Sequence, residues 1–199
     1  MAGVSEIIVR EFFELHEFLL RQHRKYTSPS GKSTEEEDID FFVMNPHFEP
    51  REAVLPFVLE PEDLCNLDRA VVVVKGWHTE TFSTARLTST PHMFRFVDPK
   101  VFEQSARAFG ADGVPAKILV VPGLPTQRQA RQQSIDLLRT KGVTAVILFR
   151  SILQDLVSNT ETNRNYQKSD LLQIIRILKT YDLFKSPQLE LFKPKKRKS

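Results

Sequence analysis

The chain has 199 residues, of which 41% are hydrophobic, enough for one core of ordinary size. The formal net charge is only +3, no window reaches the roughly 18 apolar residues of a membrane span, and the first residues lack a secretory signal pattern. A single cysteine, Cys65, excludes an internal disulfide, and no cysteine and histidine cluster has the spacing of a zinc site. We therefore expect a soluble cytoplasmic protein with no membrane partner.

The first predicted element is an amphipathic helix from Val4 to about Lys25. Apolar side chains recur on one face at about 100° per residue. They are Val4, Ile7, Ile8, Phe12, Leu15, Phe18 and Leu19. Glu11 lies within this apolar stripe, where an unpaired carboxylate is unfavourable. The pattern makes Glu11 a candidate site residue, or else the partner of a structural lysine or arginine.

Two short apolar strands follow, each with one charged residue. The strand from Ile39 to Met44 carries Asp40 near its start, and the β-branched run from Val71 ends on Lys75. A lysine at the end of a buried strand needs an anion nearby, either a carboxylate or a phosphate. Asp40 is the nearest carboxylate of the right type. Between the two strands, prolines predict a long loop with a short strand at Ala53 to Leu59.

The second half alternates helices and apolar strands. The predicted elements are a helix at Pro99–Phe109, a strand at Lys117–Pro122, a helix at Thr126–Lys141 capped by Thr126, a strand at Val143–Phe149, a short helix at Ser151–Ser158 and a last helix at about Ser169–Phe184. The segment from Thr79 to Pro99 is ambiguous. Strand, helix, strand with little polar alternation predicts parallel strands covered by helices, an α/β fold.

The C-terminal part has two features of its own. The last helix, 169–184, is apolar over a wide arc, which predicts burial in its own core or against a second subunit in a homodimer. The chain then ends on a basic tail that includes Lys195, Lys196 and Arg197. This tail suits nucleic acid, or nuclear import in a eukaryotic host, or is simply a solvated end. We expect a core at 1–150, a helical extension at 151–185 and a flexible tail at 186–199.

The element order and the sparse charged residues resemble the PD-(D/E)XK nuclease superfamily, in its Mrr-like and RecB-like branches. The resemblance covers about residues 4 to 150 and implies a restriction-endonuclease-like mixed sheet flanked by helices. It also implies an endonuclease that cleaves DNA with Mg²⁺ or Mn²⁺. In that family an acid on the first helix, an aspartate on one strand and a Glu-X-Lys or Gln-X-Lys on the next form the site. Glu11, Asp40 and Lys75 match these positions as catalytic residues, and Asp40 and Glu11 as metal ligands; Glu6 and Glu14 are alternatives for the helix acid.

One position departs from the family pattern. Val73 stands two residues before Lys75, where the family carries its second metal-binding carboxylate or amide. Valine cannot coordinate a cation that requires oxygen ligands. Asp68 and Glu80 are the nearest carboxylates that could replace it, although Glu80 lies roughly 16 Å beyond Lys75 if the chain stays extended.

Further residues are candidates for contact with nucleic acid. Trp77 could stack on a base and His78 could move a proton, while the alternatives are a core tryptophan and an ordinary loop histidine. Arg128 and Arg131 lie on a predicted helix rich in glutamine and arginine, which suits phosphate and base-edge contacts but also resembles a plain solvated face.

Three functions therefore compete: an active metal-dependent DNA nuclease, an inactive descendant that binds nucleic acid or a protein, and an unrelated α/β protein in which Asp40 and Lys75 form a structural ion pair.

Overall fold

A computed structural model describes residues 3–22, 39–50, 54–106, 109 and 114–184. The contacts divide the chain into two compact units, Met1–Asp155 and Leu156–Ser199. The acidic run at 35–38 and the basic tail with Lys195, Lys196 and Arg197 lie outside the described residues.

The first unit is built on a mixed six-stranded sheet. Its strands are β1 (Leu19–Gln22), β2 (Phe41–Met44), β3 (Val58–Leu59), β4 (Arg69–Val74), β5 (Ala116–Val121) and β6 (Ala145–Leu148). The strand order is β1-β2-β4-β5-β6-β3. β1, β2 and β4 pair antiparallel, whereas β4, β5, β6 and β3 pair parallel. The predicted α/β class and the parallel pairing of the later strands are confirmed.

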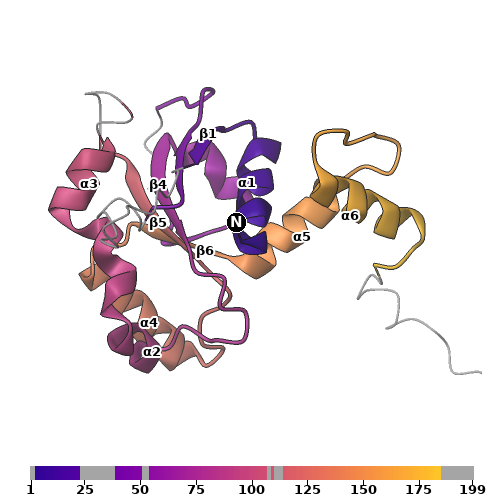
Figure 1. Ribbon diagram of the computed structural model, residues 1–199. Helices are drawn as coiled ribbons and strands as arrows, with labels where there is room; N and C mark the ends of the chain where they lie inside the picture. The colour runs from indigo at the N-terminus through magenta and orange to yellow at the C-terminus, as the bar shows by residue number, and fades with distance from the viewer. Residues whose placement is uncertain (1–2, 23–38, 51–53, 107–108, 110–113, 185–199) are drawn as a thin grey trace, which may run out of the picture. The chain divides into compact units, whose positions relative to one another are not determined.

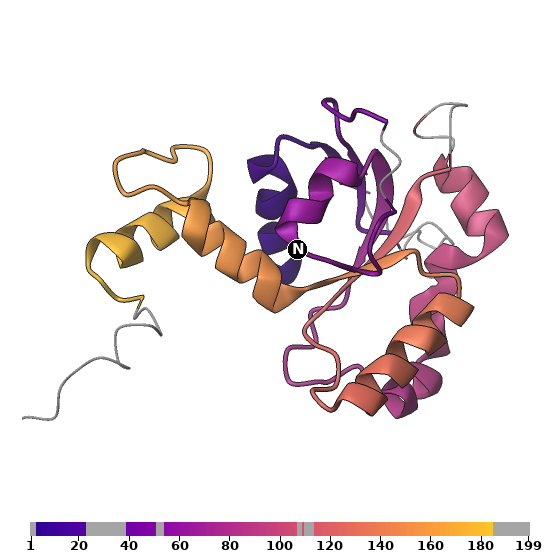
Figure 2. The same ribbon diagram turned by 180° about the vertical axis from the view of Figure 1, so that it is seen from behind.

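Helices cover both faces of this sheet. They are α1 (Val4–Leu15), α2 (Thr84–Ser89), α3 (Pro99–Ala106), α4 (Arg128–Thr140) and the start of α5 (Phe149–Asn159), with 3-10 helices η2 (Pro61–Asn66) and η3 (Pro91–Val97). Figures 1 and 2 show α1 on one side of the sheet and α2, α3 and α4 on the other. The ambiguous stretch before Pro99 thus forms α2 and η3.

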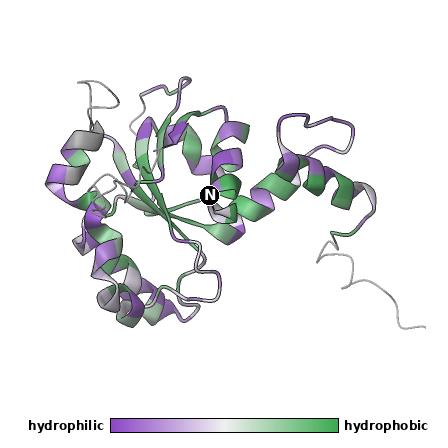
Figure 3. Cartoon of the chain, viewed as in Figure 1, coloured by the Kyte–Doolittle hydropathy of each residue, from purple (hydrophilic) through white to green (hydrophobic). Residues whose placement is uncertain are grey.

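A large apolar cluster fills the space between the sheet and the α2–α4 layer. From the strands it takes Val71, Val73, Leu119, Val121 and Val146, and from the helices Leu87, Phe94, Phe96, Phe102, Ile135 and Leu138. Figure 3 shows the same division, with hydrophobic strands inside and helices that carry both hydrophobic and hydrophilic residues. Because successive strand residues point to opposite faces, Val71 and Val73 share one face of β4.

The first helix is shorter than predicted. We expected it to run to about Lys25, but α1 ends at Leu15. Glu17 adopts a left-handed backbone (φ 62°), and the amide of Phe18 returns to the Phe13 carbonyl at 3.0 Å, which closes the helix in a Schellman arrangement. Phe18 packs edge-on against Phe13, and the chain then enters β1. The apolar residues after Leu15 therefore belong to a turn and a strand.

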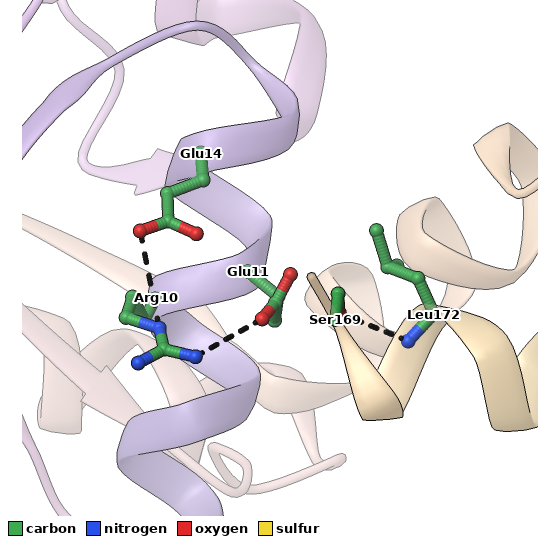
Figure 4. A network of polar contacts seen from close by, with 5 residues as sticks. All are labelled: Arg10, Glu11, Glu14, Ser169 and Leu172. Atoms are coloured by element: carbon green, nitrogen blue, oxygen red, sulfur yellow. Dashed lines mark hydrogen bonds and ion pairs between the residues drawn. The ribbon is translucent and has the colours of Figure 1, made fainter. Parts of the chain in front are cut away.

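The second unit contains the end of α5 and helix α6 (Asp170–Thr180). The Ser169 hydroxyl caps α6 by accepting a hydrogen bond from the Leu172 amide at 3.2 Å (Figure 4). Leu172 and Ile175 are buried, while Ile174, Ile177 and Tyr181 are exposed. The predicted helix continued to Phe184, but Asp182 has a left-handed backbone (φ 51°) that stops it. None of the helices described is long and apolar enough to cross a membrane.

Candidate functional site

Asp40 lies against the centre of β4 at the start of β2. Its amide donates to the Val72 carbonyl at 3.1 Å, and its carboxylate Oδ2 accepts from the Val74 amide at 2.7 Å. The side chain is only 5% exposed. A carboxylate that accepts a backbone N–H in a buried place is firmly oriented. Asp40 thus bonds to the residues on either side of Val73.

Lys75 follows β4 at the same edge of the sheet. Its amide donates to the Val120 carbonyl at 2.9 Å, which continues the pairing of β4 with β5 by one residue. Because β2 runs antiparallel to β4, the start of β2 meets the end of β4. The two residues that the sequence singled out as partners therefore lie at one sheet edge.

Val73 lies between them and belongs to the core. It is 0% exposed and packs in the cluster with residues of α2 and α4. The pairing of β2 with β4 ends at Phe41 and Val72, and Asp40, one residue before β2, bonds to Val72 and Val74 on either side of Val73. The position where the nuclease pattern expects a metal ligand thus holds a buried apolar side chain.

Glu11 is buried on α1, at 4% exposed, as predicted, but the predicted stripe is partly wrong: Val4 and Ile7 are exposed, and the buried apolar residues of α1 are Val9, Phe12 and Phe13. Its Oε1 accepts from Arg10 Nη2 at 3.1 Å, and Arg10 Nε lies 3.9 Å from Glu14 Oε1 (Figure 4). Burial raises the pKa of Glu14, Arg10 lowers it, and Glu11 adds to the rise. Glu11 therefore has the arginine partner that the structural interpretation expects.

Trp77 and Glu80 share one local cluster after Lys75. The Trp77 ring stacks on Phe82 with centroids 5.7 Å apart, and the Arg86 guanidinium lies 4.9 Å from its centroid. Glu80 Oε2 lies 3.5 Å from Arg86 Nε. Trp77 is thus already stacked within the protein, and the carboxylate expected to replace a missing metal ligand has a cation of its own.

The residues available do not fit a magnesium site. Mg²⁺ requires near-octahedral oxygen coordination, usually from one or two carboxylates with waters and substrate phosphate. Asp40 is one such ligand, but Val73 offers no oxygen, and Glu11 and Glu80 lie beside Arg10 and Arg86. Within the part of the chain that the structure describes, no three His, Cys, Asp or Glu side chains are grouped to hold an ion.

A serine that the sequence analysis missed contacts the same edge. Ser5 Oγ of α1 lies 3.0 Å from Nε2 of His78, and the His78 ring meets the Phe149 ring edge-on at 4.6 Å. Gly76 lies between them, and a Cβ there would be 2.8 Å from the Ser5 Cβ. A serine in the first turn of a helix has no distinctive sequence pattern, so only the glycine hinted at this close approach.

The predicted arginines of α4 lie at its first turn. The helix begins at Arg128 after Gln127, so Thr126 is not the cap residue. β5 ends at Val121, and after six intervening residues that follow the same strand end as Lys75 the chain enters α4. Arg128 is exposed and Arg131 half-buried.

Comparison with known proteins finds no matching family model, no similar curated protein and no similar solved structure.

Proposed function

We propose that this chain is a restriction-endonuclease-like protein that binds DNA and does not cleave it. The order of elements supports the fold: helix α1, the antiparallel strands β1, β2 and β4, further helices, and then β5 parallel to β4. Asp40 just before β2 and Lys75 just after β4 support the proposal, because the nuclease resemblance expects an aspartate and a lysine on two neighbouring strands.

The observation that carries the proposal is the buried Val73, two residues before Lys75 and flanked by the two residues that bond to Asp40. The scaffold keeps the lysine that would face a phosphate, but it lacks an oxygen ligand where a hydrolytic metal would bind. A lysine ammonium can bind phosphate directly as a point charge. Phosphate binding by Lys75 therefore needs no metal, whereas hydrolysis of the phosphodiester bond by a metal-activated water would need one.

The surface around Lys75 suits the DNA backbone better than the bases. Lys75 and His78 follow β4, and Arg128 opens α4 after β5, so all three come from segments that follow the carboxyl ends of two parallel strands. Trp77 is stacked on Phe82, so it is poorly placed to stack on a base. Phosphate contacts supply affinity without sequence information and depend strongly on salt.

Fluorescence anisotropy with a labelled 20-base-pair duplex at several salt concentrations tests binding. The wild type should bind, and Lys75→Gln should weaken binding and lower the slope of log K against log salt by about 0.9, the effect of one phosphate contact. Lys141→Gln is the matched control, because Lys141 is exposed at the opposite end of α4. Equal affinities of wild type and Lys75→Gln would contradict the proposal.

Cleavage is tested on linear and supercoiled DNA with Mg²⁺ or Mn²⁺. We expect no cleavage by the wild type, and activity in Val73→Glu would identify the missing ligand. Cleavage by the wild type that both Asp40→Ala and Lys75→Ala abolish would instead establish an active nuclease with a rearranged site. If DNA binding is absent and Lys75→Met leaves the fold intact, Asp40 and Lys75 are a structural pair.

A further inference from the structure

We infer that Ser5 orients His78 so that the imidazole donates a hydrogen bond to a backbone phosphate of the bound nucleic acid. This inference rests on the proposed DNA binding and deepens it. It assigns Ser5 as a positioning residue, adds the first turn of α1 to the binding surface, and makes His78 a contact to phosphate rather than to a base.

Gly76 permits the contact. The first turn of α1 approaches the end of β4 so closely that a Cβ on Gly76 would lie 2.8 Å from the Ser5 Cβ, nearer than real side chains approach. The His78 amide donates to the Gly76 carbonyl at 3.0 Å, which folds the ring back toward Ser5. Gly76, Trp77 and His78 thus form a tight turn, and Gly76 in that turn lies against Ser5 of α1.

A serine hydroxyl can donate or accept, and we assign the Ser5 hydroxyl as the donor to Nε2 of His78. A neutral imidazole has one donor and one acceptor nitrogen, and the partner of one nitrogen fixes the other. When the Ser5 hydroxyl donates to Nε2, at 3.0 Å, the proton resides on Nδ1. Nδ1 then donates to an anion even when the ring is uncharged.

The position of the ring indicates the class of ligand. His78 is exposed, and its recorded contacts within the described residues are Ser5 at Nε2 and the Phe149 ring at its edge. These contacts leave Nδ1 for a ligand. Lys75 lies three residues earlier at the same sheet edge, so a hydrogen-bond donor and an ammonium group occur together, the combination that phosphate oxygens accept.

Two amide variants separate ligand contact from structural contact. Asparagine carries its amide nitrogen at the place of Nδ1, whereas glutamine carries its own at the place of Nε2. We expect His78→Gln to weaken duplex binding about ten-fold, the size of one hydrogen bond to a charged group, and His78→Asn only two- to three-fold. His92→Gln, an exposed histidine on η3, should have no effect. The measurement is anisotropy at pH 8, where an ordinary imidazole is neutral.

If His78 only fastens α1 to β4, the order reverses, because glutamine keeps the Ser5 contact and asparagine loses it. That reversal would overturn the inference. Equal affinity of both variants and the wild type, together with weaker binding by Lys75→Gln, would also overturn it while sparing the proposed function. If the wild-type protein does not bind DNA at all, the proposed function itself is refuted.

A pair of substitutions, in which the second relieves the clash made by the first, tests whether Ser5 orients His78 even if one single variant is unstable. Gly76→Ala should lower both the melting temperature and DNA affinity, because the new Cβ displaces the Ser5 side chain. Adding Ser5→Gly removes the clash, so the double variant should recover its melting temperature but remain several-fold weaker in DNA binding, since no hydroxyl orients His78. Recovery of both properties would contradict the role of the hydroxyl.

Discussion

A glutamate at position 73 should destabilise the protein and create a metal site in the same step. Val73 is 0% exposed, so Val73→Glu places a carboxylate in the core, one residue before the Val74 amide that binds the Asp40 carboxylate. An uncompensated buried charge costs about 3–5 kcal/mol. Two adjacent carboxylates also repel each other unless a cation lies between them. Mg²⁺ is such a cation and should restore part of the loss.

The size of the rescue follows from ligand linkage. At a Mg²⁺ concentration about 100 times its dissociation constant, binding to the folded state adds about 2.7 kcal/mol. In a chain of this length that corresponds to a rise in melting temperature of roughly 5–10 °C. Differential scanning fluorimetry of the wild type and Val73→Glu across a Mg²⁺ titration measures it directly.

Val71→Glu is the matched control. Val71 is also 0% exposed, lies on the same face of β4 and packs in the same cluster, but it pairs with Phe42. Both variants should lose similar stability, and only Val73→Glu should regain it with Mg²⁺. Equal responses of the two variants to Mg²⁺ would refute the assignment of position 73 as a former ligand position and remove the main support for a nuclease-derived site.

Three further predictions concern the scaffold. Burial lowers the pKa of Lys117, so the charged side chain destabilises the folded state most at lower pH. Lys117→Met should therefore be at least as stable as the wild type at pH 7, and the difference in unfolding free energy should shrink as the pH rises toward 10.5. Denaturation at several pH values measures this difference. Gly142 has φ 91°, so Gly142→Ala should cost about 1 kcal/mol in urea denaturation, whereas Gly123→Ala, with open space around it, should cost almost nothing. Lys179 donates to the carbonyls at 157 and 160 (2.8 and 2.6 Å), so Lys179→Met should cost about 1–3 kcal/mol and expose the end of α5 to faster hydrogen exchange.

Local patterns predicted most of the elements, because the β-branched runs and helical stripes of this chain are long and strongly periodic. The main error was the end of α1, where Phe18 and Leu19 continue the helical pattern although the chain turns at Glu17. No glycine marks that turn, and β1 exists only because β2 is available to pair with it. Tertiary pairing of this kind leaves no local signal.

The candidate site was likewise only partly predictable from the sequence. The common sheet edge of Asp40 and Lys75 was predictable because charged residues at the ends of apolar strands need each other or a ligand. The neighbours of Trp77 were not, since its stacking on Phe82 and the approach of Arg86 depend on how the chain folds back after β4. Ser5 was unpredictable for the same reason, because its distance from His78 in sequence is 73 residues.

The valine at position 73 connects the stability of this fold with the proposed way of binding DNA. An acid buried there without a metal would lose hydration, whereas valine avoids that cost and adds buried apolar surface. In the proposed function, Lys75 contacts phosphate with no metal to share it. That binding should therefore weaken steeply with salt and ignore Mg²⁺ beyond the effect of ionic strength. The salt dependence and the metal independence of the proposed binding thus both follow from one core residue.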